Sequence, residues 1–556
     1  MRGERGTKPA DGKALIIGVL AASLLLAAIV ASLPVEILVG VVPDDSFYYL
    51  VVARNMAATG LSTFDGENPA NGYHPGWMLL LRAAAHWFPG KVELLRAALV
   101  ISFAFHAATG YLLYGCLRRF VPGAMAALAA GVWMFSYLPL VIAAFALETS
   151  LYCFCFLLSY WVYLGRVEPY LRTPSGKIPA VNLILFGSAL GLCLWARTEG
   201  ILLLACAIAW LGLATFYGGC SWRKVFLACR SGVLIGVAAL AVIAPWILYS
   251  LHNFGTVRQT SGAMKMLWRQ QENAGLSGGE RLWSDVSRYG EWICSSLPWT
   301  WGGNFGLVLA MSLVWFAFLA AATVYVVRQP REVRRAAGRV LPAVAYPLLH
   351  LFVAGAVYSA FFTDVQGWYL AMPYLEFYLA AVVLGGAIYR AEGCEERRKR
   401  WRTQAIAVAA VFTALSLVRF VQTLHQGYWA WQRDVYASLE PVDKLLPGRP
   451  PIGCFNAGIP RYFSPMRIIN LDGLTNAAVV PYWRTKQVDR YLRDAGIGII
   501  FDDALAIERA RLFMRESPRL EELAQFPMTN FVGETRFLWK LHWDPALSYQ
   551  PRPTGQ

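Results

Sequence analysis

Charged residues are scarce in this sequence. Asp, Glu, Lys and Arg make up 15% of its 556 residues, whereas soluble globular domains contain about 25%. Hydrophobic residues make up 57%, and the mean hydropathy is +0.43. This composition excludes an ordinary soluble domain and predicts an integral membrane protein.

Redox and metal motifs are also lacking. The ten Cys form no CxxC pair, and most lie inside apolar runs such as SLYCFCFLLSY, where a thiol packs as a small apolar side chain. Cys294 and Cys454 are both expected to face outward, so a disulfide between them stays open as an alternative. The seven His show no HxxxH or similar spacing, so no histidine-based metal site is predicted.

Nucleic acid is not an expected partner. The formal net charge of +15 would favour nucleic-acid binding in a soluble protein. Here no RNA-binding or DNA-binding motif accompanies it. We interpret the positive charge as the excess of Lys and Arg that orients short cytoplasmic loops of membrane proteins.

Long apolar runs are what the sequence does contain. A membrane-spanning helix needs about 20 mostly apolar residues, and eleven such runs occur. They lie near 14–34, 94–116, 122–143, 147–165, 179–197, 199–217, 227–250, 304–327, 340–362, 368–390 and 403–424. The first run is too long for the core of a signal peptide and is interpreted as the first span.

The loop charges predict an orientation in the cell membrane. If the N-terminus is cytoplasmic, alternate loops such as RQPREVRRAAGR and RAEGCEERRKRWR are basic, as the positive-inside rule requires. Residues 1–425 then form a multi-span domain with outer loops at about 43–93 and 251–303. Residues 426–556 form an extracytoplasmic domain.

The C-terminal domain has an α/β pattern. Short β-branched and aromatic runs alternate with helical stretches, as in a small mixed domain. The strand-like runs are IGCFNAG, MRIINLDG, GIGIIFDD and ETRFLWKLHW, and the helical stretches are TKQVDRYLRDA and AIERARLFMRES.

Polar residues gather where spans end on the outer side. Asp44 and Asp45 directly follow the first span, and the stretch after them is predicted to be a helix along the membrane interface. Charges among apolar spans are costly and are functional candidates. The others expected on this side are Asn71, His74, Glu148, Arg197, Glu199, Lys265, Asp364, Trp368 and Tyr369. Together they predict a polar cavity in which cations hold an anionic leaving group and a carboxylate accepts a proton.

Each of these residues also has a structural interpretation. Asp45 could cap the helix that follows it, and Glu148 could pair with Arg197. Glu199 could cap the sixth span, and His74 could hold the turn before Pro75. Lys265 could be an ordinary loop lysine. Trp368 and Tyr369 could be anchors at the membrane interface. The placement of the whole set on one side is the stronger signal.

Several segments resemble the GT-C superfamily of multi-span glycosyltransferases, which use sugars linked to lipid phosphates. The acidic pair with its helix, DDSFYYLVVARNMAATG, carries the most specific part of the resemblance. The other matching segments are GENPANGYHPGW, LETSLY, ARTEGILLL, APWILYSLHNFGTVRQTSGAMK and FNAGIPRYFSPMRIINLDGLTN. The resemblance runs from the first span into the C-terminal domain.

The resemblance implies a helical membrane bundle and a reaction. A sugar would pass from a polyprenyl phosphate to an acceptor hydroxyl, with inversion at the anomeric carbon. Asp44 is implied as the catalytic base with Asp45 as its neighbour, and Arg197 with Lys265 as the groups that bind the donor phosphate. The residues expected to position substrate are His74, Glu148, Glu199 and Asn71. The expected partners are a polyprenyl-phosphate sugar, membrane lipid, and a glycan, lipid or protein acceptor.

No cofactor is firmly expected. Two adjacent carboxylates could bind a divalent cation, and superfamily members with pyrophosphate donors need one. Members that use monophosphate donors often need none, so a metal stays open and is not the favoured alternative.

Two other functions fit parts of the sequence. A transporter or flippase of lipid-linked sugars would explain the spans and the charges among them, but no internal repeat of the kind common in transporters is found. A non-catalytic assembly subunit that binds glycan would explain the C-terminal domain. Within the enzymes, an oligosaccharide transferase and an aminoarabinose-type transferase both remain open.

Overall fold

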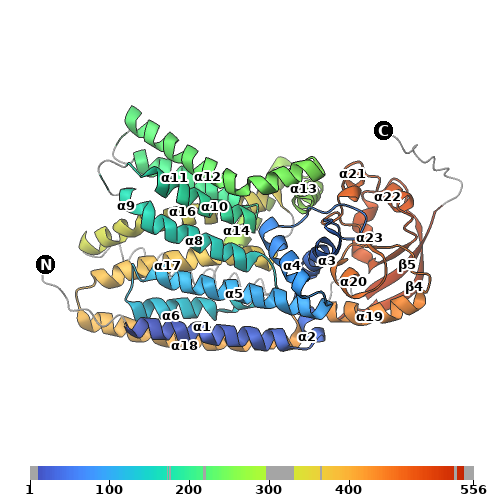
Figure 1. The fold of residues 1–556 in the computed structure, drawn as a ribbon, viewed down its shortest axis with the longest axis horizontal. Coiled ribbons are helices and arrows are strands. Elements are labelled where there is room, and N and C mark those ends of the chain that lie inside the picture. Colours follow the sequence, from blue (N-terminus) through green and yellow to red (C-terminus); the bar gives the residue numbers. More distant parts are fainter. Residues whose placement is uncertain are drawn as a thin grey trace.

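A computed structural model of the chain describes residues 10–171, 173, 177–216, 219, 221–295, 331–362, 366–530 and 535–543. Figure 1 shows an elongated bundle of long helices with a smaller domain, drawn in orange and red, at one end. Helices α3 (Asp44–Thr59) and α4 (Pro75–Trp87) lie at the junction between the two.

Ten of the eleven apolar runs coincide with helices of the bundle. The eighth, 304–327, lies outside the described residues. The helices are α1 (Ala10–Ser32), α5 (Lys91–Leu117), α6 (Gly123–Met134) with α7 (Tyr137–Ala143), α8 (Thr149–Arg166), α10 (Ala180–Ala196), α11 (Gly200–Phe216), α12 (Trp222–Phe254), α16 (Arg331–Phe361), α17 (Ala371–Ala391) and α18 (Glu395–Gln426). The polytopic helical fold is therefore confirmed.

The number of membrane crossings stays a prediction. Within the described ranges, six helices are long and apolar enough to span a bilayer. A seventh candidate is the pair α6 and α7, which is bent by 60°. Helices α10 and α11 are apolar but only 17 residues long each, slightly below the length of a typical span.

The helix after the acidic pair is confirmed, and it is packed against other parts of the protein, whereas its expected position along the membrane interface stays a prediction. Most side chains of α3 are buried on all sides, because the helix is held between the bundle and the C-terminal domain. Ser46 Oγ donates a hydrogen bond to the Phe145 carbonyl of the bundle at 2.7 Å. On another side, the Phe47 ring packs 5.5 Å from the rings of Tyr462 and Phe463.

Short elements complete the connections between the long helices. They include α2 (Val35–Val39), α9 (Glu168–Leu171), α13 (Thr260–Glu272), α14 (Gly278–Ser295) and the 3₁₀ helix η1 (Gly367–Leu370). Gly255 ends α12 with a φ of +64°, a left-handed conformation that glycine adopts readily. The chain then turns back so that α13 lies against α16 and against α21 (Val480–Arg484) of the C-terminal domain.

The C-terminal domain contains a five-stranded sheet in the order β2-β1-β3-β5-β4. The parallel strands are β1 (Ile452–Cys454), β2 (Ile468–Asn470) and β3 (Ile499–Asp503), and the antiparallel ones are β4 (Arg519–Pro527) and β5 (Thr535–His542). The helices are α19 (Trp431–Leu445), α20 (Gly458–Phe463), η2 (Ala477–Val479), α21 (Val480–Arg484), α22 (Val488–Asp494) and α23 (Ala504–Arg511).

All four strand-like runs and both helical stretches of this domain are confirmed. Strand β4 was not predicted, because its charged and mostly exposed sequence, RLEELAQFP, gives no hydrophobic alternation. Cys294 and Cys454 are both free thiols, so the disulfide considered above is not formed.

Candidate active site

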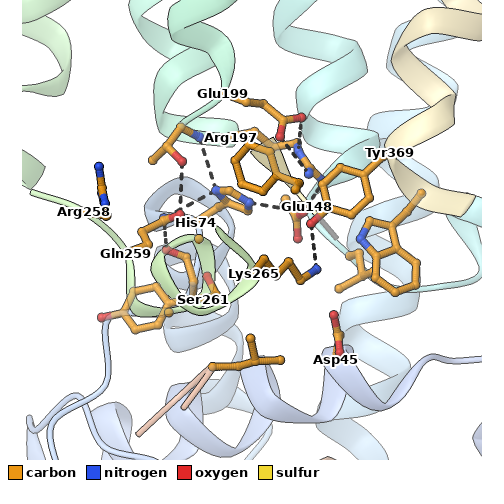
Figure 2. Close-up of a pocket in the computed structure, with 18 of the residues that line it drawn as sticks. Asp45, His74, Glu148, Arg197, Glu199, Arg258, Gln259, Ser261, Lys265 and Tyr369 are labelled. Atoms are coloured by element: carbon orange, nitrogen blue, oxygen red, sulfur yellow. Dashed lines mark hydrogen bonds and ion pairs between the residues drawn. The ribbon is translucent and has the colours of Figure 1, made fainter. Parts of the chain in front are cut away.

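A cavity of about 420 Å³, here called the Asp45 cavity, lies where the bundle, α13 and the C-terminal domain meet. Figure 2 shows its charged groups converging from several helices. Charged and polar side chains in its wall are Asp45, Tyr49, His74, Glu148, Arg197, Glu199, Arg258, Gln259, Lys265, Tyr358 and Tyr369. The polar cavity predicted from the sequence is therefore present.

The two adjacent acids have different surroundings. Asp45 lines the cavity, is half-buried, and accepts no hydrogen bond from any described residue. Asp44 is not in the cavity wall. Its carboxylate accepts the backbone N–H groups of Gly458 at 3.0 Å and Ile459 at 2.7 Å, at the start of α20. Of the two, Asp45 is the acid that a bound molecule could reach.

Helix geometry explains why the two acids diverge. Successive residues of an α-helix are rotated by about 100°, so neighbours face different surfaces. Helix α3 starts at Asp44 after Pro43, and no side chain caps it, so Asp45 is not a cap. Both acids lie in the first turn, where the helix dipole favours negative charge.

Burial raises the pKa of both acids. For Asp44 the pKa is raised to about 6, because loss of solvation outweighs the two backbone hydrogen bonds. For Asp45 burial also raises the pKa, and the positive charge of Lys265 opposes the increase. A carboxylate with a raised pKa is a stronger base than an exposed aspartate.

Lys265 projects from α13 into the same cavity. Its Nζ donates a hydrogen bond to the Tyr369 hydroxyl at 3.0 Å. Burial alone would lower the pKa of Lys265, but Tyr369 and Asp45 outweigh that effect and raise it, so the ammonium stays charged. Figure 2 shows this ammonium and the Asp45 carboxylate facing each other across open space. No ion pair closes the gap between them, which leaves room for a ligand.

Arg197 is held by an ion-pair network. Its Nη1 donates to Glu148 at 2.5 Å, and its Nε and Nη2 donate to Glu199 at 2.7 and 3.1 Å. The Tyr369 ring lies 4.6 Å from the guanidinium, and the Tyr358 hydroxyl donates to Glu199. The structural pairing considered for Glu148 is thus present, and each nitrogen of Arg197 already has a carboxylate partner.

His74 is neutral and has a defined tautomer. Its Nδ1 accepts the Thr198 N–H at 3.2 Å, so the ring proton lies on Nε2, which is 3.8 Å from Glu148. Burial, together with Arg197 and Lys265, lowers the pKa of His74 well below 6.5. Pro75 follows as the first residue of α4. His74 therefore both fixes a turn and faces the cavity.

Asn71 lies behind the cavity wall and positions it. Its Oδ1 accepts the Thr260 N–H at 3.2 Å, and its Nδ2 donates to the Arg258 carbonyl at 3.4 Å. A Cβ at the next residue, Gly72, would collide with the Leu474 carbonyl oxygen. The 71–72 segment therefore holds α13 and the 474–475 loop together.

Several cavity residues were not singled out from the sequence. Arg258 is exposed at the edge of the cavity, and its guanidinium has no partner among the described residues. Gln259 accepts from Thr198 Oγ1 at 3.1 Å and donates to the Tyr73 carbonyl. Both lie in TVRQTSGAMK, the segment that also contains Lys265. No spacing or motif in this segment indicates that Arg258 and Gln259 line the cavity as well.

The aromatic residues before α17 belong to the cavity wall. Trp368 is buried, and its ring lies 6.0 Å from the Tyr369 ring. Tyr369 in turn contacts both Arg197 and Lys265. The two are wall residues and not exposed interface anchors. Asp364 lies outside the described residues.

The two adjacent acids do not form a chelating pair. A shared divalent cation would require both carboxylates to converge, whereas Asp44 is bonded to α20 and Asp45 faces Lys265. In the part of the chain that the structure describes, no three His, Cys, Asp or Glu side chains form a metal-binding group.

Comparison with solved structures identifies the fold. The crystal structure of ArnT from Cupriavidus metallidurans bound to undecaprenyl phosphate matches with a TM-score of 0.51 and 14% identity, over 96% of this chain and 99% of that chain. Its apo state matches with a TM-score of 0.50 and 15% identity, over 94% and 98%. The oligosaccharyltransferase AglB from Archaeoglobus fulgidus gives a TM-score of 0.49 and 13% identity, over 94% and 74%.

No model of a protein family matches the sequence, and no curated protein matches it either. The chain is a multi-pass membrane protein with the GT-C fold, as the sequence resemblance predicted. The match to ArnT extends over nearly the full length of both chains. At 14% identity it establishes architecture, and the chemistry has to be argued from the residues of the cavity.

Proposed function

We propose that this protein is a glycosyltransferase that moves a sugar from a polyprenyl phosphate to an acceptor hydroxyl at the extracytoplasmic face of the cell membrane. The observation that carries the proposal is the Asp45 carboxylate, which faces Lys265 across the cavity without a hydrogen-bond partner among the described residues. A free base opposite a fixed cation suits a displacement that releases an anion.

In the proposed reaction, Asp45 accepts the proton of the acceptor hydroxyl. The acceptor oxygen forms a bond to the anomeric carbon as the bond from that carbon to the phosphate oxygen breaks, which inverts the configuration. The polyprenyl phosphate leaves as an anion and needs no proton. This assigns the base role to Asp45 in place of Asp44, whose oxygens are engaged by α20.

Lys265 and Arg258 are the proposed phosphate-binding groups. Lys265 is charged and donates one hydrogen bond to the Tyr369 hydroxyl, so its other N–H groups can bind a ligand. The Arg258 guanidinium makes no hydrogen bond to a described side chain. Arg197 also contributes positive charge to the cavity, although its guanidinium is already paired with the carboxylates of Glu148 and Glu199. The ArnT structure contains undecaprenyl phosphate, which supports a ligand of this kind in the same fold.

His74, Glu148 and Glu199 are proposed to position substrate, and Asn71 acts through the loop that it holds. The neutral His74 can donate one hydrogen bond from Nε2.

The test uses purified protein in lipid vesicles with radiolabelled polyprenyl-phosphate sugars and a panel of acceptors. Asp45→Asn is expected to keep its abundance and folding and to lose transfer by about 10²- to 10⁴-fold. A flippase would instead move labelled donor across the vesicle bilayer without forming product. A non-catalytic subunit would show no transfer, whether wild type or Asp45→Asn is assayed, and that result would overturn the proposal.

A further inference from the structure

A second cavity lies on another face of helix α3. It has a volume of about 360 Å³ and is called here the Arg54 cavity. It is lined by residues of α3, the α4–α5 turn and α20, namely Val51, Arg54, Asn55, Ala57, Ala58, Ala85, His86, Pro89, Lys91, Arg461 and Ser464. Three separate segments therefore contribute cations to one space, and nothing in the proposed reaction uses them.

The two cavities use different sides of the same helix. The α3 residues of the Asp45 cavity are at 45, 48, 49 and 52, which form one face at helical spacing. Those of the Arg54 cavity include 51, 54, 55 and 58, which form another face. Because each residue turns the helix by about 100°, the centres of the two sets are about 120° apart around the helix axis. The Arg54 cavity is thus a separate site and not an extension of the first.

The Arg54 cavity is strongly cationic. Arg54, Lys91 and Arg461 are each half-buried, and none of the residues that line the cavity is Asp or Glu. Arg54 and Arg461 repel each other, and burial and Arg54 lower the pKa of Arg461, although Asp65 opposes this. The Arg461 guanidinium nevertheless stays charged at any physiological pH. Gathering like charges at one place is unfavourable unless an anion binds there.

The nearby acid Asp65 raises the pKa of Arg461, but among the described residues no ion pair joins it to any of the three cations. Asp65 is engaged in its own turn, where its Oδ1 accepts the N–H groups of Glu67 and Asn68 at 2.9 and 2.7 Å. Its Oδ2 accepts from the Asn68 side chain at 2.6 Å. Thr63 Oγ1 also donates to Oδ1 at 3.3 Å, so all the hydrogen bonds of this carboxylate lie within residues 63–68.

Lys91 and Arg461 are each held by a hydrogen bond to a backbone carbonyl, and both have further N–H groups that can bind a ligand. Lys91 Nζ donates to the Phe463 carbonyl at 3.1 Å, and Arg461 Nε donates to the Phe64 carbonyl at 3.3 Å. The Arg54 guanidinium lies 5.9 Å from the centre of the Tyr462 ring and makes no hydrogen bond to a described residue. The guanidiniums of Arg54 and Arg461 and the remaining N–H groups of the Lys91 ammonium can therefore bind a ligand. Donors of this kind suit phosphate oxygens.

The rim of the cavity points to a lipid as the source of that phosphate. His86 and Pro89 line it, and the two residues between them are exposed aromatics. Trp87 is 77% exposed and Phe88 is 47% exposed. Exposed aromatic side chains at the end of an amphipathic helix are typical of the membrane–water interface, where phospholipid headgroups lie.

We propose that Arg54, Lys91 and Arg461 form a second binding site, separate from the Asp45 cavity, for the phosphate group of an anionic lipid held at the membrane interface. The site is independent of glycosyl transfer, because its residues and its helix face differ from those of the proposed reaction. A soluble phosphate ester could offer the same oxygens without the lipid tail, so the test includes both.

Native mass spectrometry of the purified full-length protein tests this site. The probes are phosphatidylglycerol, phosphatidylcholine and glucose 1-phosphate. Wild type is expected to retain phosphatidylglycerol, and Arg54→Gln/Arg461→Gln to bind it about tenfold more weakly, because two charge-assisted contacts are lost. The charge-matched control Arg484→Gln/Lys486→Gln, on the exposed surface of the C-terminal domain, is expected to bind as wild type.

Arg54→Lys/Arg461→Lys keeps the charge and checks folding, and is expected to bind at an intermediate level. Competition by glucose 1-phosphate as strong as that by phosphatidylglycerol would support a phosphate site and assign it to a soluble ester. Equal phosphatidylglycerol binding by wild type and the Gln variant, or equal losses in the Gln variant and the surface control, would overturn the proposal. Transfer activity is not the readout, so the result stands apart from the test of Asp45.

Discussion

The Asp44 carboxylate accepts the backbone N–H of Gly458 at 3.0 Å, so an acid at the start of α3 caps the start of α20 in the C-terminal domain. The same carboxylate accepts the N–H of Ile459 at 2.7 Å. A Cβ at Gly458 would collide with the Asp44 backbone, so the close approach requires glycine. This joint fixes the C-terminal domain against the helix that also carries Asp45.

Asp44→Asn is therefore expected to weaken the joint between the two domains. The amide has one acceptor oxygen for two N–H donors, and an unpaired buried N–H costs about 1–3 kcal/mol. We expect a lower melting temperature together with a partial loss of transfer. Asp45→Asn, the adjacent and otherwise matched change, is expected to keep the melting temperature and to lower transfer by about 10²- to 10⁴-fold. Unchanged stability with complete loss of transfer in Asp44→Asn would return the base role to Asp44.

Gly72→Ala tests another contact between the 43–93 segment and the C-terminal domain. The added methyl group would overlap the Leu474 carbonyl oxygen, and the backbone there has to move to make room. Strain of this kind typically costs about 1–3 kcal/mol, and Leu474 and Thr475 would shift in the cavity wall. Thermal unfolding and donor affinity should both fall.

Gly498→Ala is the matched control for this change. It lies in the C-terminal domain with open space around the position of the new methyl group. It is expected to leave stability and donor affinity close to wild type. Tolerance of Gly72→Ala would mean that the 474–475 loop is not held where the structure has it.

The two arginines of the Asp45 cavity are expected to have different roles, one in donor binding and one in stability. Arg258→Gln is expected to raise the KM for the donor about tenfold and to leave the melting temperature unchanged, because its guanidinium is free. Arg197→Gln leaves Glu148 and Glu199 without their shared partner, and breaking a buried pair costs about 3–5 kcal/mol. It should mainly destabilise the protein. Unchanged stability in Arg197→Gln would identify it as a ligand-binding arginine instead.

The sequence predicted most of the helical bundle, since a run of about 20 apolar residues has few alternatives to a spanning helix. It also predicted that several polar residues share one cavity, namely Asp45, His74, Glu148, Arg197, Glu199 and Lys265. It could not distinguish Asp44 from Asp45, because that difference arises from the α20 backbone, more than 400 residues away. For the same reason the burial of α3 was not predicted: the domain that covers it is distant in sequence.

Metal removal gives a further prediction. The acids do not converge, and Lys265 supplies positive charge opposite Asp45 in the cavity. Treatment with a chelator, followed by assay with and without added Mg²⁺ or Mn²⁺, is expected to leave the transfer rate unchanged. A rate that falls with chelator and returns with one of these ions would require a metal-assisted reaction.

The pH dependence of transfer gives the most specific test of the proposed base. Asp45 must be ionised to accept a proton, and burial raises its pKa above 3.8, so kcat/KM is expected to fall as the pH drops, with a midpoint above 3.8. Lys265 lowers that pKa, so Lys265→Gln should move the midpoint to higher pH besides weakening donor binding.

Two nearby groups serve as controls for this profile. His74 is neutral, since burial and its cationic neighbours lower its pKa well below 6.5, so His74→Gln should not move the midpoint. Asp44 has a pKa of about 6 and could itself cause such a transition, so the same profile is measured in Asp44→Asn. If the acidic limb persists there and shifts upward only in Lys265→Gln, the titrating base is the carboxyl that faces Lys265. A limb that disappears in Asp44→Asn or His74→Gln would assign the proton transfer to that residue instead.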